Sequence, residues 1–555
     1  MATEIPVSDP QSSGVEWWRT AVIYQVYPRS FADADGDGVG DLPGVIAKLD
    51  YLADLGIDAI WLSPFYPSPQ NDAGYDISDF CDVDPTFGTL DDFRALLVQA
   101  HMRDLKVIVD IVPNHSSDQH PWFRAALEAG PGSGERARYV FRHGRGERGE
   151  LPPNNWQSVF AGPAWTPVPD EPGQWYLNYF DSTQPDFNWE NADVHRMFDE
   201  TLRFWLDLGV DGFRIDVARG MVKPSGLPDY PPAWQHLSGD APDGTRSPMW
   251  DNEGIHEVFR GWREIVDSYP GDRILVAEAY VEPVRRLARY VRADELHQAF
   301  NFQYLRTVTA EEIRHVVEES LAEYGAVGAP STWVLNNHDN VRHVSRLGWV
   351  DPYIRNGVGI GPSDPQPDNE IGLIRARALT AVMLALPGSA YLYQGEELGL
   401  PEHTLLKGED RQDPTWRRSD GEIVGRDGAR VPLPWNSAMP AFGFSSTGRS
   451  WLPQPTEWAR FAVDTQMTDS QSTLNFYRAA LRLRSEHHLG EGSIVWDPAA
   501  ERDILHFRVG PVEVLANLSD IEIVGSGREM LLSSAPMTGK TLPPHTVAWY
   551  RCGPE

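Results

Sequence analysis

The 555-residue sequence has few cysteines and no long apolar segment. Its two cysteines, Cys81 and Cys552, are too few for the disulfide framework of a secreted protein. The N-terminal stretch MATEIPVSDP lacks a basic segment followed by an apolar one, and no uninterrupted apolar segment reaches ~18 residues. We therefore expect a cytoplasmic protein without a membrane partner.

Basic residues are also scarce, because 48 lysines and arginines face 80 acidic residues and the formal net charge is −32. A surface this negative repels phosphate backbones and anionic lipid headgroups. Nucleic acid is therefore not expected as a partner. A neutral sugar would feel little of this field.

The order of the apolar segments predicts a (β/α)₈ TIM barrel. The chain exceeds the ~250 to 300 residues of a single core, so two or three packed modules are expected. Short β-branched segments alternate with amphipathic stretches of helical spacing, which is typical of a parallel sheet. Eight strands, the number in a closed barrel, are predicted at 21–27, 58–64, 106–112, 212–217, 274–279, 298–305, 331–339 and 388–395.

Two long segments interrupt this alternation. Residues 114–190, rich in Pro, Gly and Trp, predict a small domain inserted after the third strand. A second insertion, about 401–460, follows the eighth strand. From about residue 490 the apolar pattern has period two, which predicts an antiparallel β-domain. The predicted domains are the barrel over 1–113 and 191–478, the inserted domain over 114–190 and a C-terminal β-sandwich over 479–555.

Three acidic residues end three different apolar segments: Asp216 in GFRID, Glu278 in ILVAE and Asp339 in WVLNNHD. Barrel enzymes have their active sites at the C-terminal ends of the strands, so these carboxylates should meet at one rim. Glycoside hydrolysis needs one carboxylate beside the anomeric carbon and one carboxyl group that protonates the leaving oxygen. A third negative charge helps to separate the two protonation states. Each acid alone could equally cap a strand or form a structural ion pair, for example between Arg214 and Asp216.

Four segments, in order, resemble the conserved regions of the α-amylase family of glycoside hydrolases: DIVPNH (110–115), GFRID (212–216), VAEA (276–279) and NNHD (336–339). QPDFN (184–188) resembles a signature of its oligo-1,6-glucosidase and α-glucosidase branch. The resemblance implies an exo-acting, retaining α-glucosidase that releases α-glucose from maltose and short α-gluco-oligosaccharides. Glucosyl transfer to other sugars is expected as a side activity, and the enzyme is expected to be a monomer or homodimer.

The resemblance also implies the roles of individual residues. Asp216 would be the nucleophile, Glu278 the general acid/base and Asp339 the transition-state stabiliser. The residues expected to contact the glucose are Tyr75, Asp76, His115, Arg214 and His338. Arg430 is expected to pair with Asp76. Among the aromatic residues of the inserted domain, Phe160 is the one we expect to touch the sugar, because sugar faces stack on aromatic rings.

The linkage that is cleaved stays open at this point. The segment after Asp216 is VARGM, whereas oligo-1,6-glucosidases have a sequence closer to VINF, and VFAG (159–162) replaces a more usual glycine pair. Both segments lie where a leaving sugar would contact the protein. An oligo-1,6-glucosidase and a sucrose-acting hydrolase are therefore the alternatives, although no segment resembles the RLDRD of isomerising enzymes. A more remote alternative is a non-enzymatic, transporter-associated relative, but those chains carry a transmembrane helix and tend to lose catalytic carboxylates.

The segment FADADGDGVGDL predicts a calcium site. Its acidic residues have the spacing of an EF-hand-like loop, although position 12 is Gly44 and not the usual glutamate. The predicted ligands of a single structural Ca²⁺ are Asp33, Asp35, Asp37, the backbone carbonyl of Val39, and Asp41. Without a cation these carboxylates would repel one another, which favours the metal over a solvated acidic turn. No organic cofactor is expected.

Overall fold

The computed structural model describes residues 16–231, 245–351, 358–498 and 500–553. Its central feature is a sheet of eight parallel strands in the order β10-β11-β1-β2-β3-β7-β8-β9. The strands are β1 Val22–Val26, β2 Ala59–Leu62, β3 Lys106–Ile111, β7 Gly212–Ile215, β8 Ile274–Ala277, β9 Gln298–Ala299, β10 Thr332–Val334 and β11 Ser389–Tyr393. A parallel bridge between Asn301 and Trp333 brings the two ends of the sheet together. The predicted barrel is confirmed.

Alternate residues of each strand point to opposite faces, and this alternation separates two cores. Ile23, Trp61 and Ile108, from three neighbouring strands, belong to one buried cluster inside the barrel. Their neighbours Ile60 and Val109 belong to the larger core between the sheet and the surrounding helices. A strand residue on the inward parity therefore faces the barrel axis.

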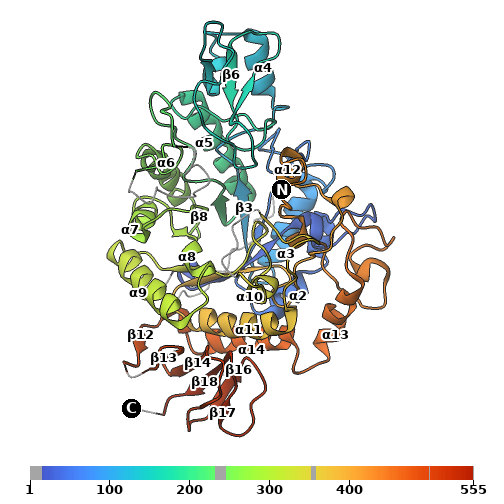
Figure 1. Cartoon of the computed structure of the whole chain (residues 1–555), viewed down its shortest axis with the longest axis vertical. Coiled ribbons are helices and arrows are strands. Elements are labelled where there is room, and N and C mark those ends of the chain that lie inside the picture. Colours follow the sequence, from blue (N-terminus) through green and yellow to red (C-terminus); the bar gives the residue numbers. More distant parts are fainter. Residues whose placement is uncertain (1–15, 232–244, 352–357, 499, 554–555) are drawn as a thin grey trace, which may run out of the picture.

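Helices surround the barrel (Figure 1). The longer ones are α3 Leu90–His101, α4 Pro121–Ala129, α5 Ala192–Leu208, α6 Ile255–Asp267, α9 Ala310–Ala326, α11 Asn369–Ala385 and α14 Thr473–Glu486. The shorter ones are α1 Leu42–Ile46, α2 Leu49–Leu55, α7 Val284–Leu287, α8 Phe302–Leu305, α10 His343–Leu347, α12 Pro414–Arg418 and α13 Val463–Met467. Helix α5 illustrates why they begin and end where they do. The side chain of Asn191 caps its first turn, and Gly209 ends it with a φ of 108° that favours glycine.

The sixth predicted strand is only partly correct. Residues 298–305 were expected to be extended, but β9 covers Gln298–Ala299 and is followed by α8. The side chain of Asn301 accepts a hydrogen bond from the backbone N–H of Tyr304. This cap starts a helical turn within an apolar segment too short for periodicity to distinguish the two structures.

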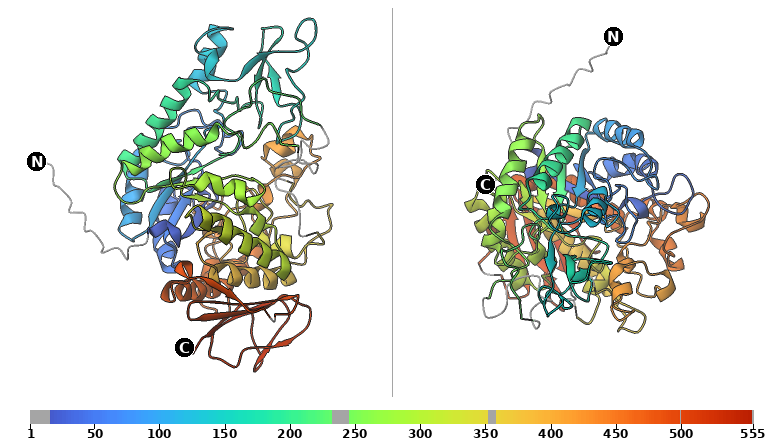
Figure 2. Two further views of the ribbon diagram at one scale, coloured as in Figure 1. Left: turned by 90° about the vertical axis from the view of Figure 1, so that its left-hand side faces the viewer. Right: turned by 90° about the horizontal axis from the view of Figure 1, so that it is seen from above.

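Two smaller sheets lie at opposite ends of the barrel (Figures 1 and 2). One contains β4 Phe141–His143, β6 Gln174–Leu177 and β5 Trp165–Pro167, in that order. Its strands come from the part of the chain that connects β3 to β7. The other is antiparallel, in the order β12-β13-β14-β18-β16, with a separate pair of β15 and β17. Its strands are β12 Ile494–Trp496, β13 Ile504–Val509, β14 Val512–Asn517, β15 Ile523–Val524, β16 Met530–Ser533, β17 Thr541–Leu542 and β18 Thr546–Arg551. The C-terminal antiparallel β-structure is confirmed, whereas the domain boundaries stay predictions.

The C-terminal sheet is attached to the barrel through α11. The indole of Trp549 in β18 is fully buried and donates a hydrogen bond of 3.1 Å to the carbonyl of Ala381 in that helix. Among the described residues, no helix has the length and apolar character needed to span a membrane.

Candidate active site

Strand register brings the first charged residues together. Asp110 in β3 and Arg214 in β7 are direct partners across the sheet, both on the inward parity. Arg214 Nη1 donates hydrogen bonds to Asp110 Oδ1 at 2.9 Å and to Asp216 Oδ1 at 2.6 Å. Because Asp216 lies two residues after Arg214, it also points inward, just beyond the end of β7. The predicted ion pair of Arg214 and Asp216 is confirmed, and Asp110 is a second partner that the sequence did not single out.

These groups share one positive charge in a buried environment. Burial raises the pKa of Asp216, and Arg214 opposes that rise because a neighbouring cation favours the carboxylate. Burial likewise raises the pKa of Asp110 to about 6. Asp110 also accepts a hydrogen bond of 3.1 Å from the hydroxyl of Tyr75. Arg214 therefore has its orientation fixed from two sides.

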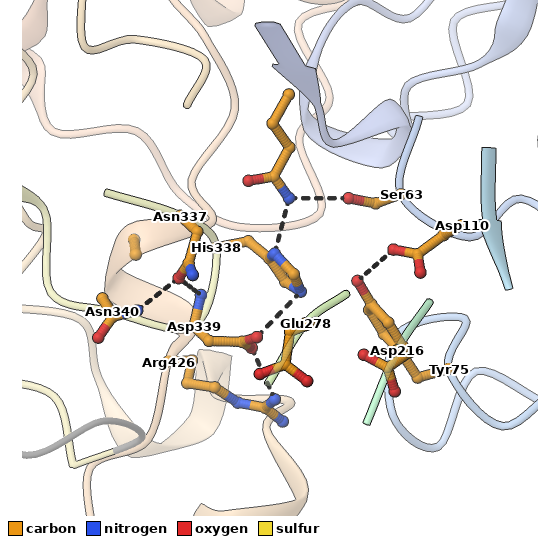
Figure 3. Close-up of polar contacts among 12 residues, drawn as sticks. Ser63, Tyr75, Asp110, Asp216, Glu278, Asn337, His338, Asp339, Asn340 and Arg426 are labelled. Carbon is orange, nitrogen blue, oxygen red and sulfur yellow. Dashed lines mark hydrogen bonds and ion pairs between the residues drawn. The ribbon is translucent and has the colours of Figure 1, made fainter. Parts of the chain in front are cut away.

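Glu278 directly follows β8 on the same inward parity. Its Oε2 accepts a hydrogen bond of 3.0 Å from the backbone N–H of Val217, the residue after Asp216. Val217 has a φ of 47°, a left-handed conformation that is strained for a β-branched residue. Figure 3 shows Asp216, Glu278 and Asp339 close together. The structure thus brings the three predicted acids to one rim.

Asp339 lies in a positively charged environment. Its Oδ1 accepts hydrogen bonds of 2.9 Å from both Arg426 and Arg430, and its Oδ2 is 3.4 Å from His338 Nε2. Burial alone would raise the pKa of Asp339, but the positive charges of Arg426, Arg430 and Arg214 lower it below its ordinary value. Asp339 is therefore an ionised carboxylate.

The predicted pair of Arg430 and Asp76 is wrong. Arg430 bonds to Asp339 and to the carbonyl of His338, whereas Asp76 accepts hydrogen bonds from Ser68 Oγ and from backbone N–H groups of its own loop. The residues that do form a pair are Asp72 and Arg426, at 2.9 Å. Arg426 also contacts Asp413 at 2.7 Å. Sequence reasoning chose the second arginine of GRDGAR and the second aspartate of NDAGYD, where the structure uses the first of each.

His115 and Phe160 lie near this pair. His115 Nε2 is 3.1 Å from the amide nitrogen of Gln184, and that amide donates to Asp72 at 3.1 Å. Burial lowers the pKa of His115 to about 3, so the ring is neutral. The guanidinium of Arg426 lies 4.8 Å from the centre of the Phe160 ring. The structure therefore places both predicted sugar contacts at the end of the site formed by Asp72 and Arg426.

The two long insertions contact each other beside this pair. Arg418 in α12 donates a hydrogen bond of 2.9 Å to the carbonyl of Ala161 and lies 3.4 Å from Asp181. Arg417, next to it, contacts the carbonyl of Asn71. Residues from the segment after β11 thus close the site against the segment between β3 and β7.

The loop that follows Asp216 forms the other side of the site. The guanidinium of Arg219 stacks on Trp250 at 4.1 Å and lies 5.6 Å from the ring of Tyr280, the residue two beyond Glu278. The N–H of Asp251 donates to the carbonyl of Arg219 at 2.8 Å. Trp250 in turn packs edge-on against Tyr179 at 4.6 Å. Arg219 belongs to the segment VARGM, which differs from that of oligo-1,6-glucosidases, but no sequence pattern predicts its stacking partner.

The acidic loop is only partly as predicted. Asp33, Asp35 and Asp37 each offer a carboxylate oxygen, and these atoms lie within 4.8 Å of one another. Asp41 instead caps α1, where its Oδ1 accepts from the N–H of Gly44 at 2.6 Å and its Oδ2 from the N–H of Ala34 at 3.0 Å. Three carboxylates within this distance suit a divalent cation with oxygen ligands.

The chain is similar to known proteins over most of its length. The family model described as alpha amylase, catalytic domain, matches residues 25–492. The chain is 36% identical over 504 residues to Maltase 1 of Drosophila virilis, which covers 86% of this chain and 74% of that protein. It is 34% identical over 512 residues to the Oligo-1,6-glucosidase of Parageobacillus thermoglucosidasius, which covers 85% and 84%. The crystal structure of an alpha-glucosyl transfer enzyme, XgtA, matches with a TM-score of 0.83 at 38% identity and covers 97% of this chain and 100% of that chain.

Proposed function

The chain belongs to the α-amylase family of glycoside hydrolases, and on that basis we propose that it is a retaining, exo-acting α-glucosidase. Its substrates are maltose and short α-gluco-oligosaccharides, from which it releases α-glucose at the non-reducing end. The observation that carries this proposal is the meeting of Asp216, Glu278 and Asp339 at one rim, with Arg214 bonded to Asp216.

The reaction proceeds by double displacement. Asp216 attacks the anomeric carbon while Glu278 gives its proton to the leaving oxygen, and a covalent glucosyl-enzyme forms. Glu278, now a carboxylate, then takes a proton from a water molecule that attacks the anomeric carbon and frees Asp216. An acceptor sugar in place of this water gives glucosyl transfer. The ionised Asp339 stabilises the positive charge that develops on the sugar ring.

Retention requires a particular spacing of the two carboxyl groups. In retaining enzymes they lie ~5 to 5.5 Å apart, because the nucleophile must reach the anomeric carbon directly. Inverting enzymes leave ~6.5 to 9.5 Å for a water molecule. We predict the shorter separation for Asp216 and Glu278 in a crystal structure of this protein.

Exo action is supported by the closed end of the site. The pair of Asp72 and Arg426 lies beside Asp339, and Arg418 ties the two insertions together next to it. An endo-acting enzyme needs a cleft that a long chain can cross from end to end. A site closed on the glucose side accepts the last sugar of a chain and leaves the rest outside.

The cleaved linkage is the finer part of the proposal. We propose the α-1,4 bond of maltose, with the α-1,6 bond of isomaltose and the bond of sucrose as alternatives. The similarities to a maltase and to an oligo-1,6-glucosidase are nearly equal, at 36% and 34% identity. The residues that touch the leaving group must therefore decide, and they lie around Arg219.

Proton NMR of the purified protein with maltose, isomaltose and sucrose in parallel tests the proposal. α-Glucose is expected as the first product, followed by slow mutarotation, with the highest rate on maltose. Early β-glucose would contradict double displacement. Faster cleavage of isomaltose or sucrose would replace the proposed substrate, and no turnover of any α-glucoside would overturn the function.

We also propose that Asp33, Asp35 and Asp37 hold one structural Ca²⁺. Asp41 would support this site through the backbone groups that it caps, and the carbonyl of Val39 would complete it. A ligand that binds only the folded state at ~100 times its Kd adds about 2.7 kcal/mol to the free energy of unfolding. Removal of Ca²⁺ with a chelator should therefore lower Tm, and Asp37→Asn should remove most of that response. A Tm that is insensitive to chelation would contradict the site.

A further inference from the structure

The ring of His338 is buried between two tyrosines, and both of its nitrogens have a polar neighbour. Tyr75 stacks on it at 5.3 Å and 5°, and Tyr27 at 5.6 Å and 20°. Nδ1 is 2.7 Å from the amide nitrogen of Gln25, and Nε2 is 3.4 Å from Asp339 Oδ2. Figure 3 shows Ser63, His338, Asp339 and Arg426 along this line of contacts.

The ring carries a single proton. Burial lowers the pKa of His338 well below its ordinary value, and the effect of Asp339 in the opposite direction is countered by Arg430, Arg214 and Arg426. A neutral imidazole has one N–H donor and one acceptor nitrogen. The proton of His338 is therefore on either Nδ1 or Nε2.

The partner of Nε2 determines which nitrogen holds the proton. Asp339 is ionised, so it can only accept a hydrogen bond. The nitrogen that faces it must therefore be the donor, and Nδ1 must be the acceptor. A proton on Nδ1 would instead direct the Nε2 lone pair at a carboxylate.

The partner of Nδ1 agrees with this assignment. An acceptor Nδ1 needs a donor, which the NH₂ group of Gln25 provides. The second hydrogen of that group has its own acceptor, because Ser63 Oγ lies 3.0 Å from the same nitrogen. Gln25 is in β1 and Ser63 directly follows β2, where its N–H donates to the carbonyl of Val26 at 3.0 Å. The register of two neighbouring strands thus fixes the amide.

We propose that Gln25, oriented by Ser63, is a positioning residue that holds His338 in its Nε2–H tautomer. In this tautomer the ring presents an N–H donor to Asp339 and to a sugar hydroxyl in the site. The kinetic part of this inference rests on the proposed function, whereas the position of the proton does not.

A neutron crystal structure of the unmodified protein in D₂O tests the proton position directly. We expect a deuteron on Nε2 of His338, none on Nδ1, and the two amide deuterons of Gln25 directed at Nδ1 and at Ser63 Oγ. A deuteron on Nδ1 facing the amide oxygen of Gln25 would overturn the inference. This result is independent of whether any α-glucoside is hydrolysed.

Gln25→Glu tests the consequence for catalysis through the pH profile of kcat/KM. The new carboxylate faces Nδ1 and can only accept, so it favours a doubly protonated ring. At low pH both nitrogens then carry a proton and Nε2–H is retained. As pH rises through the raised pKa of His338, the ring keeps its proton on Nδ1 and loses the donor at Nε2, because position 25 lies 2.7 Å from Nδ1 whereas Asp339 lies 3.4 Å from Nε2. We expect kcat/KM of this variant to fall by ~10- to 100-fold across that ionisation, the effect of losing one charge-assisted hydrogen bond.

Two further variants separate positioning from packing. Gln25→Leu removes the amide without adding a charge, and Ser63→Ala removes only the group that orients the amide. Both are expected to lower kcat/KM without adding an ionisation to the profile, and Ser63→Ala by less. The inference fails if Gln25→Glu has the same profile shape as Gln25→Leu. If the unmodified protein hydrolyses no α-glucoside, the proposed function fails and the neutron structure still decides the tautomer.

Discussion

The glucose side and the leaving-group side of the site are held together by different kinds of contact. On the glucose side, buried charged side chains bond to one another: Arg214 to Asp216 at 2.6 Å, and Arg426 to Asp72 at 2.9 Å. On the leaving-group side, the guanidinium of Arg219 stacks on Trp250 and donates a hydrogen bond to the backbone carbonyl of Tyr280, and the carbonyl of Arg219 accepts one from the N–H of Asp251. Charge-assisted pairs fix the geometry of both partners, whereas a cation–π contact needs only a cation over the face of a ring. We expect the first arrangement to select one sugar in one pose and the second to accept leaving groups of several shapes.

Glu278 lies where the two sides meet, so its loss should have the largest effect. Glu278→Gln keeps the shape of the side chain but cannot give a proton to the leaving oxygen. We expect turnover of maltose to fall by ~10² to 10⁴-fold. The leaving group of an aryl α-glucoside with an acidic phenol needs little protonation, so the rate of its first step should fall much less.

Stopped-flow release of the phenol, compared with steady-state release of glucose from maltose, measures this difference. Glu282→Gln is a suitable control, because Glu282 is an exposed acid four residues further along the chain. Equal losses on the two substrates, or a nearly full rate on maltose, would contradict the role of Glu278 as proton donor.

Asp72→Asn tests the glucose side alone. It removes one of the carboxylates that hold Arg426 while the contacts of Arg426 with Asp339 and Asp413 remain. We expect kcat/KM to fall by ~10- to 100-fold, as for a charge-assisted hydrogen bond. The fall should be the same for maltose, isomaltose and an aryl glucoside, because all three place a glucose at this end.

Asp76→Asn provides the matched comparison. Asp76 bonds to Ser68 and to backbone groups of its own loop. Its replacement should therefore lower Tm, whereas kcat/KM should change less than in Asp72→Asn. A larger catalytic effect at Asp76 than at Asp72 would mean that the original pairing with Asp76 describes the working enzyme.

The two sides also differ in how far the sequence could predict them. The residues at strand ends were predictable, because side chains alternate between the two faces of a strand. An acidic residue on the inward parity at the C-terminal end of a barrel strand must lie at the rim of the barrel. Asp216 and Glu278 follow this rule, and the structure brings them together. Asp72 and Arg426 lie in loops, where no such parity applies and a shift of four residues in either segment leaves a plausible pair. The choice of Asp76 and Arg430 failed for that reason.

The leaving-group side was the least predictable part. The sequence showed that VARGM differs from the expected segment, but the partner of Arg219 is Trp250, more than thirty positions away in a loop without periodicity. Such a contact depends on tertiary packing alone. The residues that we propose to decide the linkage preference therefore have neighbours that only the folded chain reveals.

Arg219→Gln should have the smallest effect of these changes and the most selective one. It removes the guanidinium that covers Trp250 and donates to the carbonyl of Tyr280, while the ion pairs of Arg214 and Arg426 on the glucose side stay in place. A cation–π contact contributes ~0.5 to 2 kcal/mol, so the ratio of kcat/KM for maltose to that for isomaltose should change by ~2- to 30-fold. The aryl glucoside, whose leaving group is flat and apolar, should be affected differently from either disaccharide. Arg219→Lys keeps the charge and loses the planar stack, so a ratio equal to that of Arg219→Gln would assign the effect to stacking, and a ratio equal to that of the unmodified protein would assign it to the charge. If both variants lower kcat/KM equally for all three substrates, Arg219 acts on the glucose side as well, and the division of the site into two kinds of contact is wrong.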